Sequence, residues 1–245
     1  MNKKKNVVSI VQARMGSTRL PGKVLMDIIG KPMLWHVVNR LKYSKFIDRI
    51  VIATTRNKND DILELFCKDQ EIDFFRGNEE DVLDRYYQAA NLYQADVIVR
   101  ITADCPLIDP FVVDKVITGY LENHEHLDGA SNIIKRTYPK GLDTEVVSYA
   151  TLEKIRKNAT RKYEREHVTI FIYEHLELFK LHSVENPNNL SDLRWTVDEE
   201  ADLRFVREIY RILYQDSKMV FMDDVLKILK KEPQLAQINK NIKHK

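Results

Sequence analysis

The segment at residues 12–23 combines the residue types that bind phosphate groups. It reads QARMGSTRLPGK and holds two glycines, two hydroxyl residues, two arginines and one lysine, with no acid. Gly16 and Gly22 permit backbone turns that a Cβ would obstruct, and successive N–H groups in such turns can bind an anion. The arginines offer forked donors and the lysine a point charge. These basic residues are Arg14, Arg19 and Lys23.

This segment matches neither of two familiar phosphate loops. Lys23 is followed by Val24, which excludes G-x-x-x-x-G-K-[ST], and G-x-G-x-x-G is also absent. The spacing therefore leaves two interpretations open. One is a polyphosphate-binding loop, and the other is a solvated basic loop that folds back on nearby carboxylates.

An acidic residue follows another strand-like run and could complete a phosphate site. Asp104 comes soon after the apolar run at 96–101. Mg²⁺ prefers hard oxygen ligands and commonly uses few protein carboxylates together with substrate phosphates. A carboxylate opposite a basic loop is therefore explained by Mg²⁺ between them. The alternative is a turn residue before Pro106.

The elements that position these residues alternate between strand-like and helix-like patterns. Apolar strands with helices between them predict a largely parallel sheet covered on both faces, in a doubly wound α/β fold. Ligands in such folds bind beyond the carboxyl ends of the strands, where the basic segment begins. The expected strands are 6–11, 49–54, 72–75, 96–101 and 179–184, after a loop and extended segment at 137–147. The expected helices are 33–42, 60–69, 80–93, 110–122, 149–157, 162–175, 201–214 and 222–231.

Length and composition favour one domain over residues 1–245. We expect a first half at 6–130, a second half at 131–215 that lays a substrate-binding subdomain over the rim of the sheet, and C-terminal helices with a basic tail at 216–245. The net charge of +2 gives no reason to expect a nucleic-acid partner. Two cysteines exclude a disulfide scaffold and suit a reducing cytoplasm. The first apolar run, VVSIV, is too short to span a membrane, so the expected location is cytoplasmic.

The segment QARMGSTRLPGKVL, followed by GKPML, resembles the nucleoside-triphosphate loop of the sugar cytidylyltransferases. That family includes the CMP-sialic acid and CMP-Kdo synthetases, and the closest resemblance is to the spore coat polysaccharide biosynthesis protein F group. It runs roughly over residues 6–215, and it implies a nucleotide-binding half at 6–130 and an acceptor-binding and dimerisation half at 131–215. It implies a Rossmann-like fold of the nucleotide-diphospho-sugar transferase (GT-A) type, CTP as substrate and Mg²⁺ as cofactor. The implied catalytic residues are Arg14, Arg19, Lys23 and Asp104, and the implied metal ligands are Asp104 and Asp198.

The resemblance also implies binding residues, most of which have a structural alternative. Asp198 in RWTVDEEADL equally suits a helix N-terminus. The resemblance places the segment 75–90 beside the nucleoside, with Arg76, Asp81 and Arg85 as polar candidates. The same segment could be a helix start capped by Asn78, with an Asp81–Arg85 pair. The implied nucleotide-binding residues are Gln12, Ala13, Gly16, Ser17, Arg76, Asp81, Thr102 and Ala103. The implied acceptor-binding residues are Lys140, Asp143, Glu145, Arg165 and His167.

Three features of the second half also have two interpretations. The segment 136–148 could bind an acceptor sugar, with Gly141 allowing close approach, or form a hairpin. His167 could act as a base, although a lone helical histidine is more often structural. The apolar stripe of 162–175 could form a dimer contact or belong to the core. Its members are Val168, Phe171 and Ile172.

The predicted activity is transfer of CMP from CTP to an acidic or modified sugar, with release of pyrophosphate, by a homodimeric enzyme. One alternative is a glycosyltransferase that uses a nucleotide-sugar donor, but its usual D-x-D is replaced by A-D-C-P. A second is a sugar-phosphate nucleotidyltransferase that uses another nucleotide, although its usual G-x-G-x-R loop is absent. A third is a nucleotide-binding module without activity.

Overall fold

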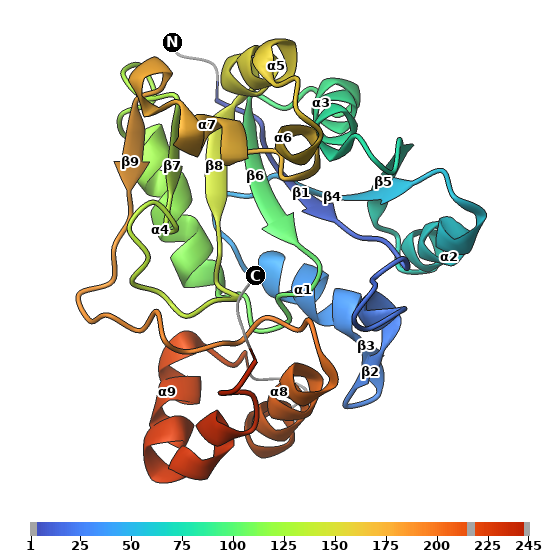
Figure 1. Ribbon diagram of the computed structural model, residues 1–245, viewed down its shortest axis with the longest axis vertical. Helices are drawn as coiled ribbons and strands as arrows, with labels where there is room; N and C mark the ends of the chain where they lie inside the picture. The colour runs from blue at the N-terminus through green and yellow to red at the C-terminus, as the bar shows by residue number, and fades with distance from the viewer. Residues whose placement is uncertain (1–3, 215–218, 243–245) are drawn as a thin grey trace.

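A seven-stranded sheet forms the centre of the computed structural model, which describes residues 4–214 and 219–242 (Figure 1). Its strand order is β5-β4-β1-β6-β8-β7-β9. β8 runs antiparallel to both of its neighbours, and the other pairs in the sheet are parallel. The strands are β1 (Val7–Gln12), β4 (Arg49–Thr55), β5 (Asp73–Gly77), β6 (Val97–Thr102), β7 (Gly129–Ser131), β8 (Glu145–Ser148) and β9 (Leu181–Ser183), with a separate pair, β2 (Asp27–Ile28) and β3 (Lys31–Pro32).

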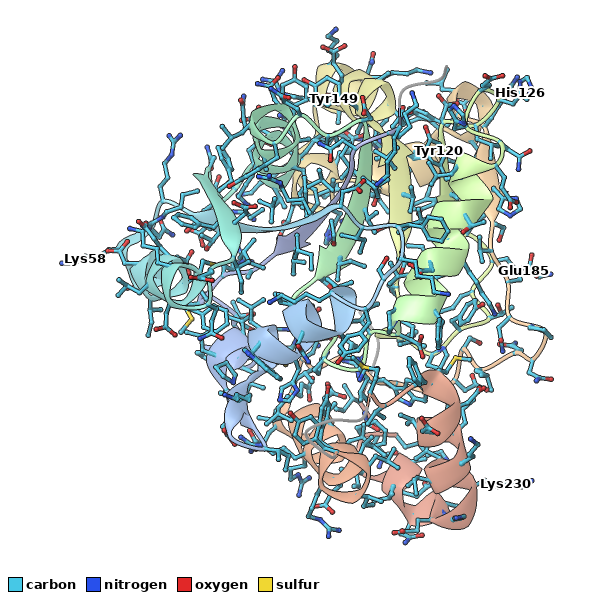
Figure 2. The ribbon with its side chains drawn as sticks, turned by 180° about the vertical axis from the view of Figure 1, so that it is seen from behind. Lys58, Tyr120, His126, Tyr149, Glu185 and Lys230 are labelled. Atoms are coloured by element: carbon cyan, nitrogen blue, oxygen red, sulfur yellow. The ribbon has the colours of Figure 1, made fainter. Side chains whose placement is uncertain are left out.

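Helices cover both faces of the sheet because the inner strands are apolar on both sides. Val7 and Val11 of β1 pack into one core, and Val8 and Ile10 into the other. The first core takes side chains from α1, α2 and α4, and the second from α3, α5 and α7. Figure 2 shows α4 in front of the sheet, and its labelled Tyr120 belongs to the first core. The helices of these layers are α1 (Met33–Leu41), α2 (Asp61–Asp69), α3 (Val82–Leu92), α4 (Pro110–Leu121), α5 (Tyr149–Asn158), α6 (Lys162–Glu166) and α7 (Ile170–Glu174).

A third core lies beyond the ends of β1 and β6, where α8 (Glu200–Leu213) and α9 (Met222–Lys231) pack together (Figure 1). Buried Trp195 and Phe205 belong to it. Arg40 of α1 ties it to the sheet, since its buried guanidinium donates to backbone carbonyls of Ile108 and Val220. The short 3-10 turns are η1 (Lys23–Leu25), η2 (Lys58–Asp60), η3 (Leu176–Leu178) and η4 (Pro233–Gln237).

The doubly wound, mostly parallel α/β fold is confirmed, and most predicted elements occur within a few residues of their expected bounds. The pairs β2–β3 and β7–β8 were not predicted; the latter joins across a long loop that includes 132–144. Among the described residues, none of the helices combines the length and apolarity needed to cross a membrane. The predicted basic tail ends at residues 243–245, outside the described residues.

The helix predicted at 162–175 is wrong in one respect, because the chain breaks it into α6 and α7. Val168 lies between them with φ of 56°, a left-handed conformation that ends a helix. Its side chain is nevertheless buried in the second core together with Phe171 and Ile172. The apolar stripe is therefore core, and the homodimer stays a prediction without support from it.

The predicted start of α3 is also wrong in its capping. Asp81, not Asn78, is the N-cap, since its carboxylate accepts from the Asp84 amide at 2.9 Å. The same carboxylate pairs with Arg165 at 2.7 Å rather than with Arg85. This ion pair joins α6 to the start of α3.

Candidate active site

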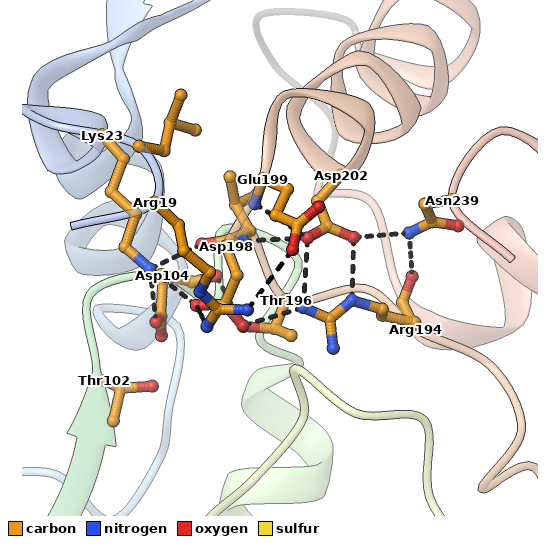
Figure 3. A network of polar contacts seen from close by, with 12 residues as sticks. Arg19, Lys23, Thr102, Asp104, Arg194, Thr196, Asp198, Glu199, Asp202 and Asn239 are labelled. Atoms are coloured by element: carbon orange, nitrogen blue, oxygen red, sulfur yellow. Dashed lines mark hydrogen bonds and ion pairs between the residues drawn. The ribbon is translucent and has the colours of Figure 1, made fainter. Parts of the chain in front are cut away.

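The basic loop closes onto two carboxylates that come from distant parts of the chain (Figure 3). Gly22, at φ of 72°, turns the chain into η1, so that Lys23 points toward the sheet edge. The Lys23 ammonium donates to Asp104 at 2.9 Å, to Asp198 at 3.0 Å and to the Val197 carbonyl at 2.7 Å. Burial acts to lower the pKa of Lys23, but the two carboxylates outweigh it and the pKa is raised. Lys23 therefore stays charged at neutral pH.

Asp198 is the most heavily paired acid of this group. Its Oδ1 also contacts the Arg19 guanidinium at 2.9 Å, and its Oδ2 accepts from Arg194 at 2.8 Å. Burial acts to raise the pKa of Asp198, but Lys23 and Arg19 outweigh it and lower the pKa. The carboxylate is therefore ionised and available to a cation.

A buried layer holds this carboxylate in place. Asp202 is fully buried at the start of α8 and accepts from Arg194 at 2.9 Å, from Asn239 at 2.9 Å and from the Asp198 amide at 3.0 Å. Gly141 lets the neighbouring segment approach, because a Cβ there would lie 2.5 Å from the Thr196 amide nitrogen.

A pocket of about 320 Å³ lies over the basic loop and the carboxylates. A smaller pocket of about 130 Å³ adjoins it and adds residues of α3, Val82 and Arg85. Both pockets share Gln12, Ala13, Arg14 and His167. Most predicted site residues line the larger one: Gln12, Ala13, Arg14, Ser17, Arg19, Lys23, Thr102, Ala103, Asp104, His167 and Asp198.

Hydrogen bonds fix the backbone of the basic loop, whereas its arginine side chains can exchange partners. The Met15 amide donates to Asp60 at 2.7 Å, and the Gly22 amide donates to the Met15 carbonyl at 3.0 Å. Arg14, by contrast, has one ion pair within the described residues, to the half-exposed Glu79 at 3.5 Å. Such exposed pairs are weak, so an incoming anion can take over the guanidinium.

The amino-acid sequence matches a known family over most of its length. The family model described as "Cytidylyltransferase" matches residues 8–242. The chain belongs to the cytidylyltransferase family. The resemblance noted in the sequence and the predicted enzyme class, a nucleotidyltransferase, are thereby confirmed.

Individual relatives of this cytidylyltransferase agree with that family. An uncharacterized protein, MJ1063, of Methanocaldococcus jannaschii is 39% identical over 98% of this chain and 96% of its own. The spore coat polysaccharide biosynthesis protein SpsF of Bacillus subtilis is 35% identical over 84% of this chain and 87% of its own. A 3-deoxy-manno-octulosonate cytidylyltransferase of Geobacter sulfurreducens is 32% identical over 60% of this chain and 58% of its own. A solved cytidylyltransferase from Leptospira borgpetersenii superposes with a TM-score of 0.92 at 34% identity, covering 98% of this chain and 100% of the other.

Asp104 and Asp198 of this cytidylyltransferase fit the ligand preferences of Mg²⁺. Their oxygens meet at a single ammonium, so they already converge on one cation. In the part of the chain that the structure describes, no cluster of three or more acidic, histidine or cysteine side chains could hold a metal without help. Two carboxylates completed by substrate phosphates are the arrangement that Mg²⁺ commonly uses.

Several predicted residues lie outside the pockets and have other partners. Arg76 pairs with Asp61 and Glu64 of α2, both at 2.7 Å. Asp143 forms a two-bond pair with Arg136, and Lys140 contributes its backbone to a bridge with Arg194. The remaining members of this group are Gly16, Asp81, Glu145 and Arg165.

One residue of the site, Arg194, was not predicted in a role. Arg194 lies four residues before Asp198 in the RWTVD segment, but this segment is not helical, so the i,i+4 rule gave no signal for the pair. Arg85 is 2% exposed and lines the smaller pocket. The resemblance places Arg85 among the polar candidates beside the nucleoside, and that role stays a prediction.

Proposed function

We propose that this cytidylyltransferase transfers CMP from CTP to an acidic or modified sugar and releases pyrophosphate, in cell-surface or spore-coat polysaccharide biosynthesis. The observation that carries the proposal is the convergence of Asp104 and Asp198 on Lys23, at the mouth of the basic loop. The name of the 3-deoxy-manno-octulosonate cytidylyltransferase supports an acidic sugar as the acceptor, and the name of SpsF supports a role in polysaccharide biosynthesis.

The proposed roles follow from where the charges lie. The triphosphate would take Arg14, Arg19 and Lys23 away from their present acidic partners. Asp104 and Asp198 would hold Mg²⁺, which neutralises phosphate charge when bound. The nucleoside would occupy the smaller pocket between Arg14 and α3.

The reaction itself needs little covalent chemistry from the protein. A sugar hydroxyl oxygen attacks the α-phosphorus of CTP and forms a new P–O bond. The bond to the bridging oxygen of the β-phosphate breaks, and its electron pair leaves with pyrophosphate. The hydroxyl proton passes to water. Arg19 and Lys23 would stabilise the charge that develops on the phosphate oxygens.

The acceptor would enter from the side of the second half that carries His167, which lines both pockets. Lys140 and Asp143 lie outside these pockets in the ligand-free protein, so a role in acceptor binding would require that the acceptor extend beyond them. The proposed homodimer is tested separately by the molar mass in solution.

The decisive experiment measures pyrophosphate release with Mg²⁺ and each of CTP, UTP, GTP, ATP and TTP against acidic and phosphorylated sugars. Release with CTP and one sugar class would support the proposal and identify the acceptor. Release with another nucleotide would contradict the choice of CTP. Consumption of a nucleotide-sugar without pyrophosphate release from any pair would favour a glycosyltransferase instead.

A further inference from the structure

A row of polar side chains crosses the sheet directly beneath the pockets. Ile10 of β1 pairs with Arg100 of β6, and Arg100 pairs with Glu145 of β8. Gln12 lies two residues beyond Ile10, so the pleat points it to the same face as Arg100. That face is the one covered by α3, α5 and α7.

Arg100 and Glu145 form a buried ion pair in this row. The Glu145 side chain is 3% exposed and accepts from the Arg100 Nη1 through one oxygen. Its other oxygen accepts from the Tyr173 hydroxyl of α7 at 2.6 Å. Glu145 therefore has a partner on each oxygen, and its predicted contact with the acceptor stays a prediction.

The second nitrogen of Arg100 reaches the pocket wall. Its Nη2 donates to the Gln12 Oε1 at 3.4 Å. A guanidinium has donors and no acceptor, so only the oxygen of the Gln12 amide can face it. The amide nitrogen is then directed away from Arg100, and Gln12 lines both pockets.

The smaller pocket has further donors beside Gln12. Arg85 is 2% exposed, donates from Nη1 to the Asn78 carbonyl at 3.0 Å, and has an Nε without a partner. Arg14 lines the same pocket, with Glu166 and His167 also on its wall. Two guanidinium groups and an oriented amide thus favour a ligand that presents hydrogen-bond acceptors.

We propose that Arg100, held by Glu145 and Tyr173, is a positioning residue that fixes Gln12 as a hydrogen-bond donor to an oxygen or ring-nitrogen acceptor of the bound substrate. The acceptor atom belongs either to the nucleoside of CTP or to the sugar. The identity of the substrate rests on the proposed function, whereas the orientation of Gln12 rests only on this row of contacts.

The test uses a substitution that keeps the acceptor oxygen of the Gln12 side chain and replaces its amide donor with a second acceptor. Gln12→Glu still offers an oxygen to Arg100, but it presents a second oxygen where the amide donated. We expect about tenfold weaker substrate binding, since a lost hydrogen bond and a new repulsion together exceed about 1.4 kcal/mol. The melting temperature should not fall. Gln234→Glu, at an exposed position near α9, makes the same charge change as a control.

Two assays identify the source of the acceptor atom. Calorimetric titration of CTP with Mg²⁺, in the absence of sugar, reports the nucleoside. The KM of the sugar at saturating CTP reports the sugar. A loss in one assay assigns the contact to that substrate, and unchanged values in both assays would overturn the proposal.

The double substitution Arg100→Met with Glu145→Met tests whether Arg100 acts through Gln12. It removes both charges together, so no unpaired buried charge remains. We expect the double variant to bind substrate more weakly without an equal loss of kcat. In that background, Gln12→Glu should weaken substrate binding by a smaller factor than it does in the parent. Strictly additive losses would show that Arg100 supports only the fold, and the proposal would then fail.

A third measurement does not depend on any substrate. The ¹⁵N relaxation of the Gln12 side-chain amide, assigned by its absence in Gln12→Glu, should show a rigid amide in the parent and a mobile one in the double variant. Equal mobility in both would overturn the proposed orientation. If the parent binds no CTP, the proposed function fails, while this measurement still decides the role of Arg100.

Discussion

Lys23 holds together two carboxylates that would otherwise repel each other. Asp104 and Asp198 lie 94 positions apart in the printed sequence and meet only at its ammonium. Arg19 and Arg194 further neutralise Asp198. The site is therefore closed by its own ion pairs, and the proposed substrate binding would exchange these partners for phosphates and a metal.

This arrangement predicts the effect of removing either carboxylate charge. Asp104→Asn and Asp198→Asn should each lower the rate of pyrophosphate release by about 10²–10³-fold, comparable to the loss of one preorganised electrostatic contact. Folding should persist, because each variant leaves Lys23 one carboxylate partner. The rate and the melting temperature are measured together, with Asp69→Asn at an exposed position of α2 as the control. A near-normal rate in either variant would remove that residue from the mechanism.

Much of the element order could be predicted because β1, β4 and β6 are mostly apolar runs. β7 could not, since its three residues are Gly129, Ala130 and Ser131, which carry no strand signal. The break at Val168 was equally hidden, because a β-branched residue rarely adopts a positive φ. The packing of the second core holds Val168 in that conformation.

For the site, too, the sequence predicted the features that local motifs encode and missed those that long-range contacts decide. The basic loop and Asp104 are local motifs, so the sequence predicted their proximity to a ligand. The partners of Arg76 and Glu145 depend on neighbouring elements, and sequence reasoning assigned both residues to ligands. Pairing across β6, β8 and α7 decides the partners of Glu145, and no spacing rule reports them.

The link between α3 and α6 gives a prediction with a matched control. Arg165 holds Asp81 at 2.7 Å, and both side chains are about three-quarters buried. Lys162 contacts Glu80 at 3.4 Å, but both of these side chains are 74% exposed. Arg165→Met should lower the melting temperature by about 4 °C, from a loss of one to two kcal/mol. Lys162→Met should change it by less than about 1 °C. Equal effects would show that burial does not decide the strength of this link.

The contact between α1 and α8 predicts a dependence of stability on pH. His36 is 1% exposed, bonds to the Ile28 carbonyl at 2.7 Å and packs 4.5 Å from the Tyr210 ring. Burial lowers the pKa of His36 from 6.5 to about 4. The unfolded chain therefore binds a proton between these values while the folded protein does not, so stability falls as the pH drops from 6.5 toward 4.

His36→Gln removes this titration while keeping a donor for Ile28. The parent should lose up to about 3 kcal/mol more stability than the variant between pH 6.5 and 4. Urea unfolding at several pH values measures the difference. If the free energies of unfolding of the two proteins change with pH in parallel, His36 does not keep its neutral form in the folded protein.

At the scale of the whole molecule, three cores meet around the site. β1 and β6 bring Gln12 and Asp104 from between the first two cores, whereas Asp198 comes from the segment that enters α8 and the third core. The proposed metal site is thus split between the sheet and the C-terminal helices. Any ligand that bridges Asp104 and Asp198 ties these parts together and must stabilise the folded state as a whole.

This bridging predicts that CTP and Mg²⁺ stabilise the protein jointly. At a ligand concentration of about 100 times Kd, binding adds about 2.7 kcal/mol, which corresponds to a rise of roughly 5–10 °C in melting temperature for a chain of this size. CTP with a chelator should give a much smaller rise, because without the metal the triphosphate gains only the basic loop and leaves the two carboxylates as repelling neighbours. Asp104→Asn combined with Asp198→Asn should remove most of the difference that Mg²⁺ makes while retaining the smaller response to CTP alone. An equal rise with and without Mg²⁺ in the parent would mean that the two carboxylates serve Lys23 rather than a metal, and the split site would then be a structural clamp.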